Sequence, residues 1–187
     1  QGKKDFQELT DFAASEYQVS DLNAWDLAYY SEKLKQSRYA ISDQELRPYF
    51  PETKVVSGLF EVVNRLFGLT IKQRDDVDVW HSDVKFFDVF DADNNQRGSF
   101  YLDLYARDKK RGGAWMDDCV GRRQLTAHEQ GADSRAVQLP VAYLTCNFNA
   151  PVGGKPALFT HDEVVTLFHE FGHGIHHMLT QINASGV

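Results

Sequence analysis

The chain is poor in cysteine, with only Cys119 and Cys146 among its 187 residues. These two are too far apart in the sequence to form the closely spaced pair of a cysteine zinc site. Two cysteines in a chain of this size also do not make the disulfide framework of a small secreted protein. Cys146 stands among apolar neighbours, so we expect it to be a packed thiol and not a nucleophile.

Long apolar runs, blocks of basic residues and a signal-peptide core are also missing from the sequence. The formal net charge is −7, which argues against nucleic acid or an anionic membrane as a partner. A cytoplasmic location is therefore expected. The sequence starts at Gln1 without an initiator methionine, so we expect a piece of a longer chain or a processed product.

The composition is that of an ordinary globular protein, with 42% hydrophobic and 25% charged residues. A chain of this length can bury a core of its own, so one domain is the natural expectation for residues 1–187. The 13 phenylalanines and 8 tyrosines are expected to supply much of that core.

Residues 1–68 are predicted to be mainly helical. One helix is expected over 21–39, and a capping box of Ser-Asp-Gln-Glu predicts a short helical turn over 42–48. A stronger helix is expected over 51–67, with Gly68 as its stop. The apolar stripe of this last helix consists of Val55, Leu59, Val62, Val63, Leu66 and Phe67.

Residues 69–150 are predicted to be mainly strands and loops. Two segments rich in Phe, Val, Tyr and Leu, 83–91 and 99–106, flank a polar turn and predict a β-hairpin. A third strand is expected over 140–148. Helices followed by a small sheet and then by a buried helix favour an α+β fold.

The final helix is predicted over 160–182. It opens with a second capping box, Thr160 to Glu163, whose acidic residues also suit the positive end of the helix dipole. Apolar residues then recur every three or four positions, which predicts a buried stripe. The stripe consists of Val164, Phe168, Phe171, Ile175, Met178 and Ile182.

This helix carries the pattern H-E-x-x-H at residues 169–173. Residues four apart lie one helical turn apart, about 6 Å along the axis, so His169 and His173 can bind one zinc ion. Glu170 is rotated away from them, which suits a base that takes a proton from an attacking water. The competing interpretation is a pair of packed histidines without a metal.

A zinc site of this kind needs a third protein ligand. The class that continues as H-E-x-x-H-x-x-G-x-x-H is excluded, because His176 stands at the glycine position and Leu179 at the last histidine position. The other class uses a glutamate on a later helix, and residues 174–187 contain no Asp or Glu. His176 and His177 are too far along the helix to reach the metal easily, and we expect them to be supporting or surface residues.

The sequence around this motif, FTHDEVVTLFHEFGHGIHHML at 159–179, resembles the zinc helix of the thimet oligopeptidase family of zinc metallopeptidases, and of its bacterial members in particular. The segments at 22–36, 46–68, 98–122 and 140–149 resemble the same enzymes in the same order. The resemblance covers nearly the whole chain from about Leu22 onward.

The resemblance implies a cytoplasmic oligopeptidase that hydrolyses internal bonds of short peptides, within a larger, mostly helical, two-lobed protein. It implies His169 and His173 as zinc ligands, Glu170 as the catalytic base and one Zn²⁺ per complete site. It places the third ligand, a glutamate, beyond the end of this chain. It also implies that an extended substrate lies along the strand around 144–148.

Three expectations follow for the chain itself. Its partners are short peptides and the remaining part of the parent chain, with no nucleic acid and no membrane. Alone, it should be weakly active or inactive, because two histidines hold zinc loosely. The alternative is a peptide-binding or interaction module in which the zinc helix is vestigial.

Overall fold

The computed structural model describes residues 1–40, 42–125, 129 and 137–184. The chain divides into two compact units, Gln1–Pro48 and Tyr49–Val187. Together their helices and a small mixed sheet give the α+β fold predicted from the sequence. None of the helices in the described ranges is long and apolar enough to cross a membrane.

The first unit is built on two helices, α1 (Gly2–Tyr17) and α2 (Leu27–Tyr39). Leu9 and Ala13 of α1 are buried. The ring of Tyr17 packs edge-on against that of Tyr30, with ring centroids 5.4 Å apart.

The helix expected over 21–39 begins later than predicted, at Leu27. The carboxylate of Asp26 accepts a hydrogen bond from the backbone N–H of Asn23, and this contact holds the preceding residues in a turn. No residue of α2 is buried, and Trp25 is 79% exposed. Among the described residues of this unit, burial of apolar side chains therefore does not determine the residue at which α2 begins.

The capping box at the end of the first unit is confirmed. The backbone N–H of Glu45 donates to the hydroxyl of Ser42, and the carboxylate of Glu45 accepts from the N–H of Ser42. This box opens α3 (Asp43–Leu46), and a 3₁₀ turn, η1 (Arg47–Tyr49), follows it.

The second unit opens with α4 (Glu52–Phe67), which ends at Gly68 in the left-handed conformation, as predicted. Val55, Leu59 and Val63 are buried, as the stripe predicts. The rest of the predicted stripe is wrong for this unit, because Val62, Leu66 and Phe67 are 40%, 69% and 56% exposed. They lie on the flank of the helix that does not face the sheet core.

The sheet of the second unit has five strands in the order β1-β2-β3-β7-β4. All neighbours are antiparallel except β3 and β7, which are parallel. The strands are β1 (Thr70–Arg74), β2 (Lys85–Phe90), β3 (Gln96–Tyr105), β4 (Trp115–Val120) and β7 (Val141–Phe148). A separate pair, β5 (Arg123–Gln124) and β6 (Val137–Gln138), forms a two-stranded sheet.

The predicted hairpin is confirmed as β2 and β3. Its turn is closed by Asp91, whose carboxylate accepts from the backbone N–H groups of Asp93 and Asn95 at 3.1 and 2.8 Å. The hydrogen bond from the Asn95 N–H holds the pKa of Asp91 below its ordinary value. Asn94 takes the positive φ, 60°, that such a turn requires.

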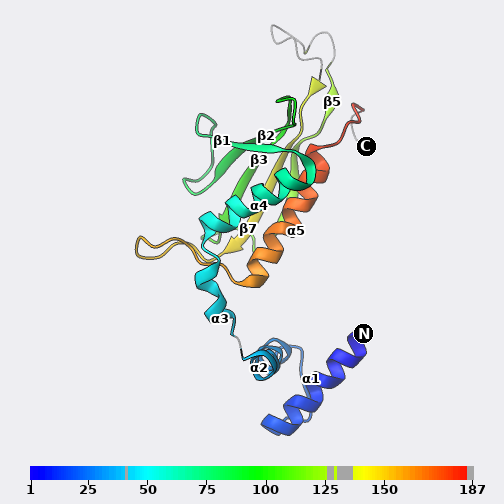
Figure 1. The fold of residues 1–187 in the computed structure, drawn as a ribbon, viewed down its shortest axis with the longest axis vertical. Coiled ribbons are helices and arrows are strands. Elements are labelled where there is room, and N and C mark those ends of the chain that lie inside the picture. Colours follow the sequence, from blue (N-terminus) through cyan, green and yellow to red (C-terminus); the bar gives the residue numbers. More distant parts are fainter. Residues whose placement is uncertain (41, 126–128, 130–136, 185–187) are drawn as a thin grey trace. The chain divides into compact units, whose positions relative to one another are not determined.

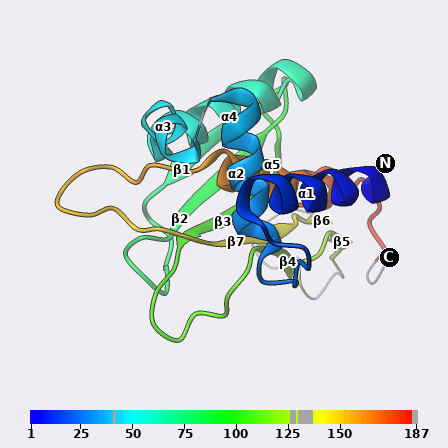
Figure 2. The same ribbon diagram turned by 90° about the horizontal axis from the view of Figure 1, so that it is seen from below.

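One face of the sheet is covered by α4 and by α5 (His161–Met178), which lie on the same side of the strands (Figures 1 and 2). Alternate residues of the two central strands point to this side and are buried there. From β3 and β7 the core takes Phe100, Leu102, Leu104, Ala142, Leu144, Cys146 and Phe148.

The last helix ends four residues earlier than predicted, at Met178. Ile182, expected in the buried stripe, is 58% exposed. Beyond the helix the chain turns toward β5, where the carbonyl of Asn183 accepts from the N–H of Gln124 at 2.8 Å. A contact between distant segments thus ends the helical pattern, and local spacing does not reveal it.

Candidate metal centre

The helix α5 is fixed at its start and along its buried face. The hydroxyl of Thr160 accepts from the N–H of Glu163 at 3.1 Å, and the Glu163 carboxylate accepts from the N–H of Thr160 at 2.7 Å. This confirms the predicted capping box. Farther along, Phe171, Ile175 and Met178 are buried in the core against the sheet. The helix therefore presents its other face in a fixed orientation.

His169 and His173 are both exposed on that other face. Their Nε2 atoms lie 3.2 Å apart, and their ring planes cross at 80°. Two nitrogens bound at about 2.0–2.1 Å to one tetrahedral zinc lie about 3.3 Å apart. The donor atoms thus stand where a single zinc ion requires them, and the residues fit the metal that the motif predicts.

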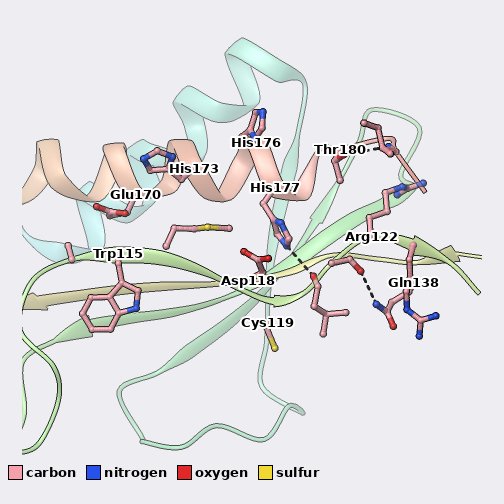
Figure 3. A pocket seen from close by; sticks show the side chains of 16 residues that line it. Trp115, Asp118, Cys119, Arg122, Gln138, Glu170, His173, His176, His177 and Thr180 are labelled. Atoms are coloured by element: carbon pink, nitrogen blue, oxygen red, sulfur yellow. Dashed lines mark hydrogen bonds between the residues drawn. The ribbon is translucent and has the colours of Figure 1, made fainter. Parts of the chain in front are cut away.

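Glu170 lies beside the histidine pair but is buried. In the described part of the chain, no side chain or backbone N–H donates a hydrogen bond to its carboxylate. Among the described residues, Arg47 Nε is the one fully buried side-chain polar atom without a partner, so the carboxylate of Glu170 itself keeps contact with solvent. Glu170 lines a groove, as Figure 3 shows, together with His173.

A third metal ligand is not supplied by the described residues. Among them, no group of three or more His, Cys, Asp or Glu side chains could hold a metal ion. His176 is exposed and points away from β4 in Figure 3, and His177 points toward it. The Nε2 atom of His177 lies 3.1 Å from the carbonyl oxygen of Val120, so this ring is engaged with the strand.

The groove has a volume of about 1040 Å³ and runs between α5 and β4. Its strand side is formed by residues 114–116 and 118–123, and its helix side includes Glu170, His173, His176 and His177. In Figure 3 the helix and the strand run in the same direction, with Glu170 beside Trp115 and His177 farther along. Sequence reasoning missed this strand, because its middle residues are two aspartates.

The position of β4 corrects the expectation for the substrate strand. The residues around 144–148 belong to β7, which pairs with β3 on one side and with β4 on the other. From Val141 to Thr145 both edges of β7 are paired, so an extended peptide cannot add there, and the loop before β4 continues beside Asn147. The described sheet has two edge strands, β1 and β4, and β4 is the one that lies beside the groove.

The prediction that Cys146 is a packed thiol is confirmed by its burial. Burial, and then the charge of Glu170, raise the pKa of its thiol to about 12. Cys119 is partly buried on β4, and its thiol donates to the hydroxyl of Tyr143 at 3.0 Å. Both cysteines are free.

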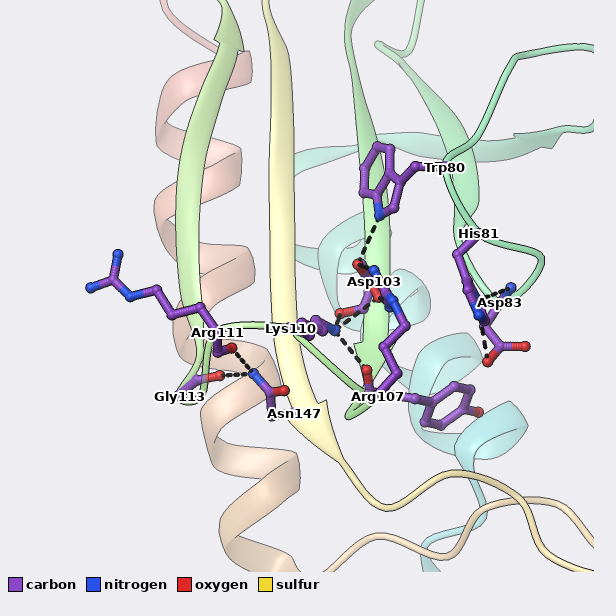
Figure 4. A network of polar contacts seen from close by, with 10 residues as sticks. Trp80, His81, Asp83, Asp103, Arg107, Lys110, Arg111, Gly113 and Asn147 are labelled. Atoms are coloured by element: carbon purple, nitrogen blue, oxygen red, sulfur yellow. Dashed lines mark hydrogen bonds and ion pairs between the residues drawn. The ribbon is translucent and has the colours of Figure 1, made fainter.

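A polar network on the opposite face of the sheet, shown in Figure 4, was not predicted. Asp103 of β3 is buried and accepts two hydrogen bonds from the guanidinium of Arg107, at 2.6 and 2.7 Å. Lys110 donates to the same carboxylate at 2.8 Å, and the indole N–H of Trp80 donates to it at 3.1 Å. Burial acts to raise the pKa of Asp103, but the bonds from Arg107, Lys110 and Trp80 outweigh it and hold the pKa below its ordinary value.

This network positions the groove indirectly. Arg107 and Lys110 lie on the loop that leads from β3 to β4. The side chain of Asn147 donates to two carbonyls of the same loop, those of Arg111 and Gly113, both at 2.7 Å. The loop is thereby anchored to β3 and β7 just before β4 begins.

Comparison with known proteins agrees with the resemblance seen in the sequence. The chain is 65% identical over its whole length to oligopeptidase A of Escherichia coli (strain K12), and 60% identical to oligopeptidase A of Haemophilus influenzae. It is 42% identical over 156 residues, 83% of the chain, to a dipeptidyl carboxypeptidase of Salmonella typhimurium. The chain spans 26% of the length of each oligopeptidase A and 22% of that carboxypeptidase. The model of peptidase family M3 matches residues 1–187, and the chain belongs to that family.

Proposed function

We propose that this chain is the part of a zinc-dependent oligopeptidase that carries two of its zinc ligands, its catalytic base and one side of its substrate groove. The observation that supports this most strongly is the pair of Nε2 atoms 3.2 Å apart, with the unpartnered carboxylate of Glu170 beside them. The oligopeptidases among its relatives point to the same activity.

In this proposal His169 and His173 hold the metal, and a glutamate from outside the described residues completes the site. Zinc, when bound, supplies a Lewis acid that polarises the peptide carbonyl and lowers the pKa of water. Two imidazoles suit zinc well among the divalent metals. The exposure of both rings leaves room for the third ligand and for the substrate.

Glu170 acts as the general base. Its carboxylate takes a proton from the water that attacks the scissile carbonyl, and later gives that proton to the leaving amine nitrogen. Because no described donor occupies this carboxylate, its lone pairs are free to accept the proton. The side chain is largely enclosed by protein, and it lines the groove, where an attacking water can reach its carboxylate.

The substrate is a short extended peptide whose backbone pairs with the free edge of β4. Pairing of this kind uses main-chain hydrogen bonds, so it tolerates many side chains and suits an enzyme of broad specificity. The groove beside β4 gives such a peptide a path to Glu170 and His173. A cytoplasmic location remains a prediction for this protein.

A peptide-binding module with a vestigial zinc helix is the alternative. The enzyme is favoured by the intact Glu170 beside the histidine pair, since a module that only binds peptides has no need of that base. The two functions differ when Glu170 is changed to Gln, because an enzyme should lose turnover and a binding module should lose nothing.

The test of the proposed function uses the full-length protein, its zinc content and an internally quenched short peptide. We expect one zinc per chain, cleavage within the peptide, and loss of cleavage on chelation that added zinc restores. His173→Ala should lose zinc and activity together, and His161→Ala, an exposed histidine at the start of α5, should retain both. Cleavage that survives complete removal of metal would contradict the proposal.

The same assay tests the expectation for residues 1–187 alone. With two of three ligands, the isolated chain should bind zinc much more weakly than the full-length protein and cleave the peptide slowly or not at all. Cleavage at the full-length rate by the isolated chain would show that the third ligand is not needed.

A further inference from the structure

We propose that His177 ends the part of the β4 edge with which a substrate can pair, and so limits how many substrate residues contribute to binding on one side of the scissile bond. The inference rests on the proposed function, because it assigns a role to a residue in the same groove. It concerns a residue four positions beyond His173, on the next turn of α5.

Two observations place this limit at Val120. The regular pairing of β4 with β7 breaks between Asp118 and Val120, where Cys119 is an extra residue. At the same point the imidazole of His177 reaches from α5 to the carbonyl oxygen of Val120, at 3.1 Å. The strand loses its regular edge where the helix side chain crosses the groove.

The imidazole ring of His177 lies where it would block further backbone pairing between a peptide and the edge of β4. His177 is partly buried and points toward β4, as Figure 3 shows. A peptide that followed the edge past Val120 would have to displace the ring and compete for the carbonyl that it occupies. The regular free edge is thus Trp115 to Asp118, next to Glu170 and His173.

The direction of the substrate decides which of its ends meets the limit. We take the peptide to pair antiparallel to β4, as β7 does on the other side. Because β4 and α5 run in the same direction, the N-terminal part of such a peptide lies toward Val120 and His177. Residues N-terminal to the scissile bond therefore pair with β4 until His177 stops them.

The experiment measures kcat/KM in the full-length enzyme for two peptide series, one lengthened residue by residue before the scissile bond and one lengthened after it. In the wild type, each paired residue before the bond should raise kcat/KM about threefold to tenfold. The increase should stop after the few residues that Trp115 to Asp118 can pair. Residues added after the scissile bond should not show a plateau in kcat/KM that depends on His177.

His177→Ala should move the plateau of the first series to peptides longer by one or two residues. His177→Gln, whose amide can still donate to the Val120 carbonyl, should keep the wild-type plateau. His161→Ala is the matched control, because that histidine is exposed at the start of α5 and does not line the groove, and it should also keep the plateau. His177→Ser serves as the second truncation if His177→Ala does not fold.

Zinc content and melting temperature accompany each variant, so that a loss of structure is not mistaken for a change in the groove. An unchanged plateau in the folded truncations would overturn the inference, and so would an equal change in His161→Ala or a change seen only in the second series. Failure of the proposed function looks different: the wild type would then cleave no peptide of either series.

Discussion

Gly174 of α5 lies directly against Leu144 of β7. A Cβ atom at position 174 would come within 3.0 Å of the Leu144 Cδ2 atom, closer than ordinary van der Waals contact. Gly174 immediately follows His173, so the distance between α5 and the sheet is fixed next to a proposed metal ligand. The geometry of the site therefore depends on a residue that takes no part in its chemistry.

Gly174→Ala should destabilise the protein by about 1–3 kcal/mol, because the added methyl group meets a buried side chain. Gly172→Ala, two residues earlier, has nothing within 4 Å of its added Cβ and should stabilise the helix by roughly 0.5–1 kcal/mol. Urea unfolding measures the free energy of unfolding of both variants and so tests the expected difference between them. Equal effects of the two substitutions would show that the contact with Leu144 does not set the position of the helix.

Glu170→Gln should lower kcat for peptide cleavage in the full-length protein by about 10²–10⁴-fold, because the amide cannot take the proton from water. Zinc content and the affinity for a non-cleaved peptide should stay near wild type, since neither needs the charge. Steady-state kinetics and equilibrium binding measure the two effects separately. A variant that cleaves normally would favour the peptide-binding module over the enzyme.

Asp103→Asn should cost about 3 kcal/mol of folding free energy, because it leaves Arg107 and the buried Lys110 without their counter-charge. Asp108→Asn, an exposed residue of the same loop, should change stability by less than about 0.5 kcal/mol. Chemical denaturation at pH 7 compares the two. A small effect at Asp103 would mean that the network does not anchor the loop before β4.

The same residue predicts a dependence on pH. The pKa of Asp103 lies below its ordinary value of 3.8 in the folded protein, so its contribution to stability is present above pH 3.8 and is lost as the pH falls through the folded pKa. The wild type should therefore lose more stability than Asp103→Asn in that range. Unfolding curves measured between pH 5 and the acid limit of folding would detect the difference, and parallel curves would contradict it.

Cys146 should resist alkylation in the folded protein. With a pKa of about 12, its thiol is ionised to only about one part in ten thousand at pH 8, and it is fully buried. Cys119, which is only partly buried, should react first with iodoacetamide, and Cys146 should react after unfolding in urea. Peptide mapping by mass spectrometry identifies the labelled residue, and equal native rates would show that β7 opens easily.

Much of the second unit could be predicted from local patterns. The capping box at Thr160, the buried stripe of α5, the left-handed stop at Gly68 and the turn at Asp91 are each encoded within a few residues. The histidine pair belongs to the same class, because helical spacing alone brings residues four apart together. Such features can be read from the sequence without knowledge of the rest of the fold.

The groove could not be predicted in this way. Its two sides, β4 and α5, are some 57 residues apart at the contact between Val120 and His177. The middle of β4 is exposed and acidic, so it lacks the alternation that marks a half-buried strand. Whether a strand takes an edge or an interior place depends on the order of the whole sheet, so the sequence does not show that the strand at 144–148 lies between two others.

The order of the strands also sets an order of assembly on the ribosome. Within the described sheet, β4 pairs only with β7, yet it is synthesised before β7. Residues 115–120 thus leave the ribosome without a partner strand and join the sheet only when residues 141–148 insert between them and β3. The helix α5 follows β7 in the chain, so the strand wall of the groove and the proposed metal ligands are completed one after the other in synthesis.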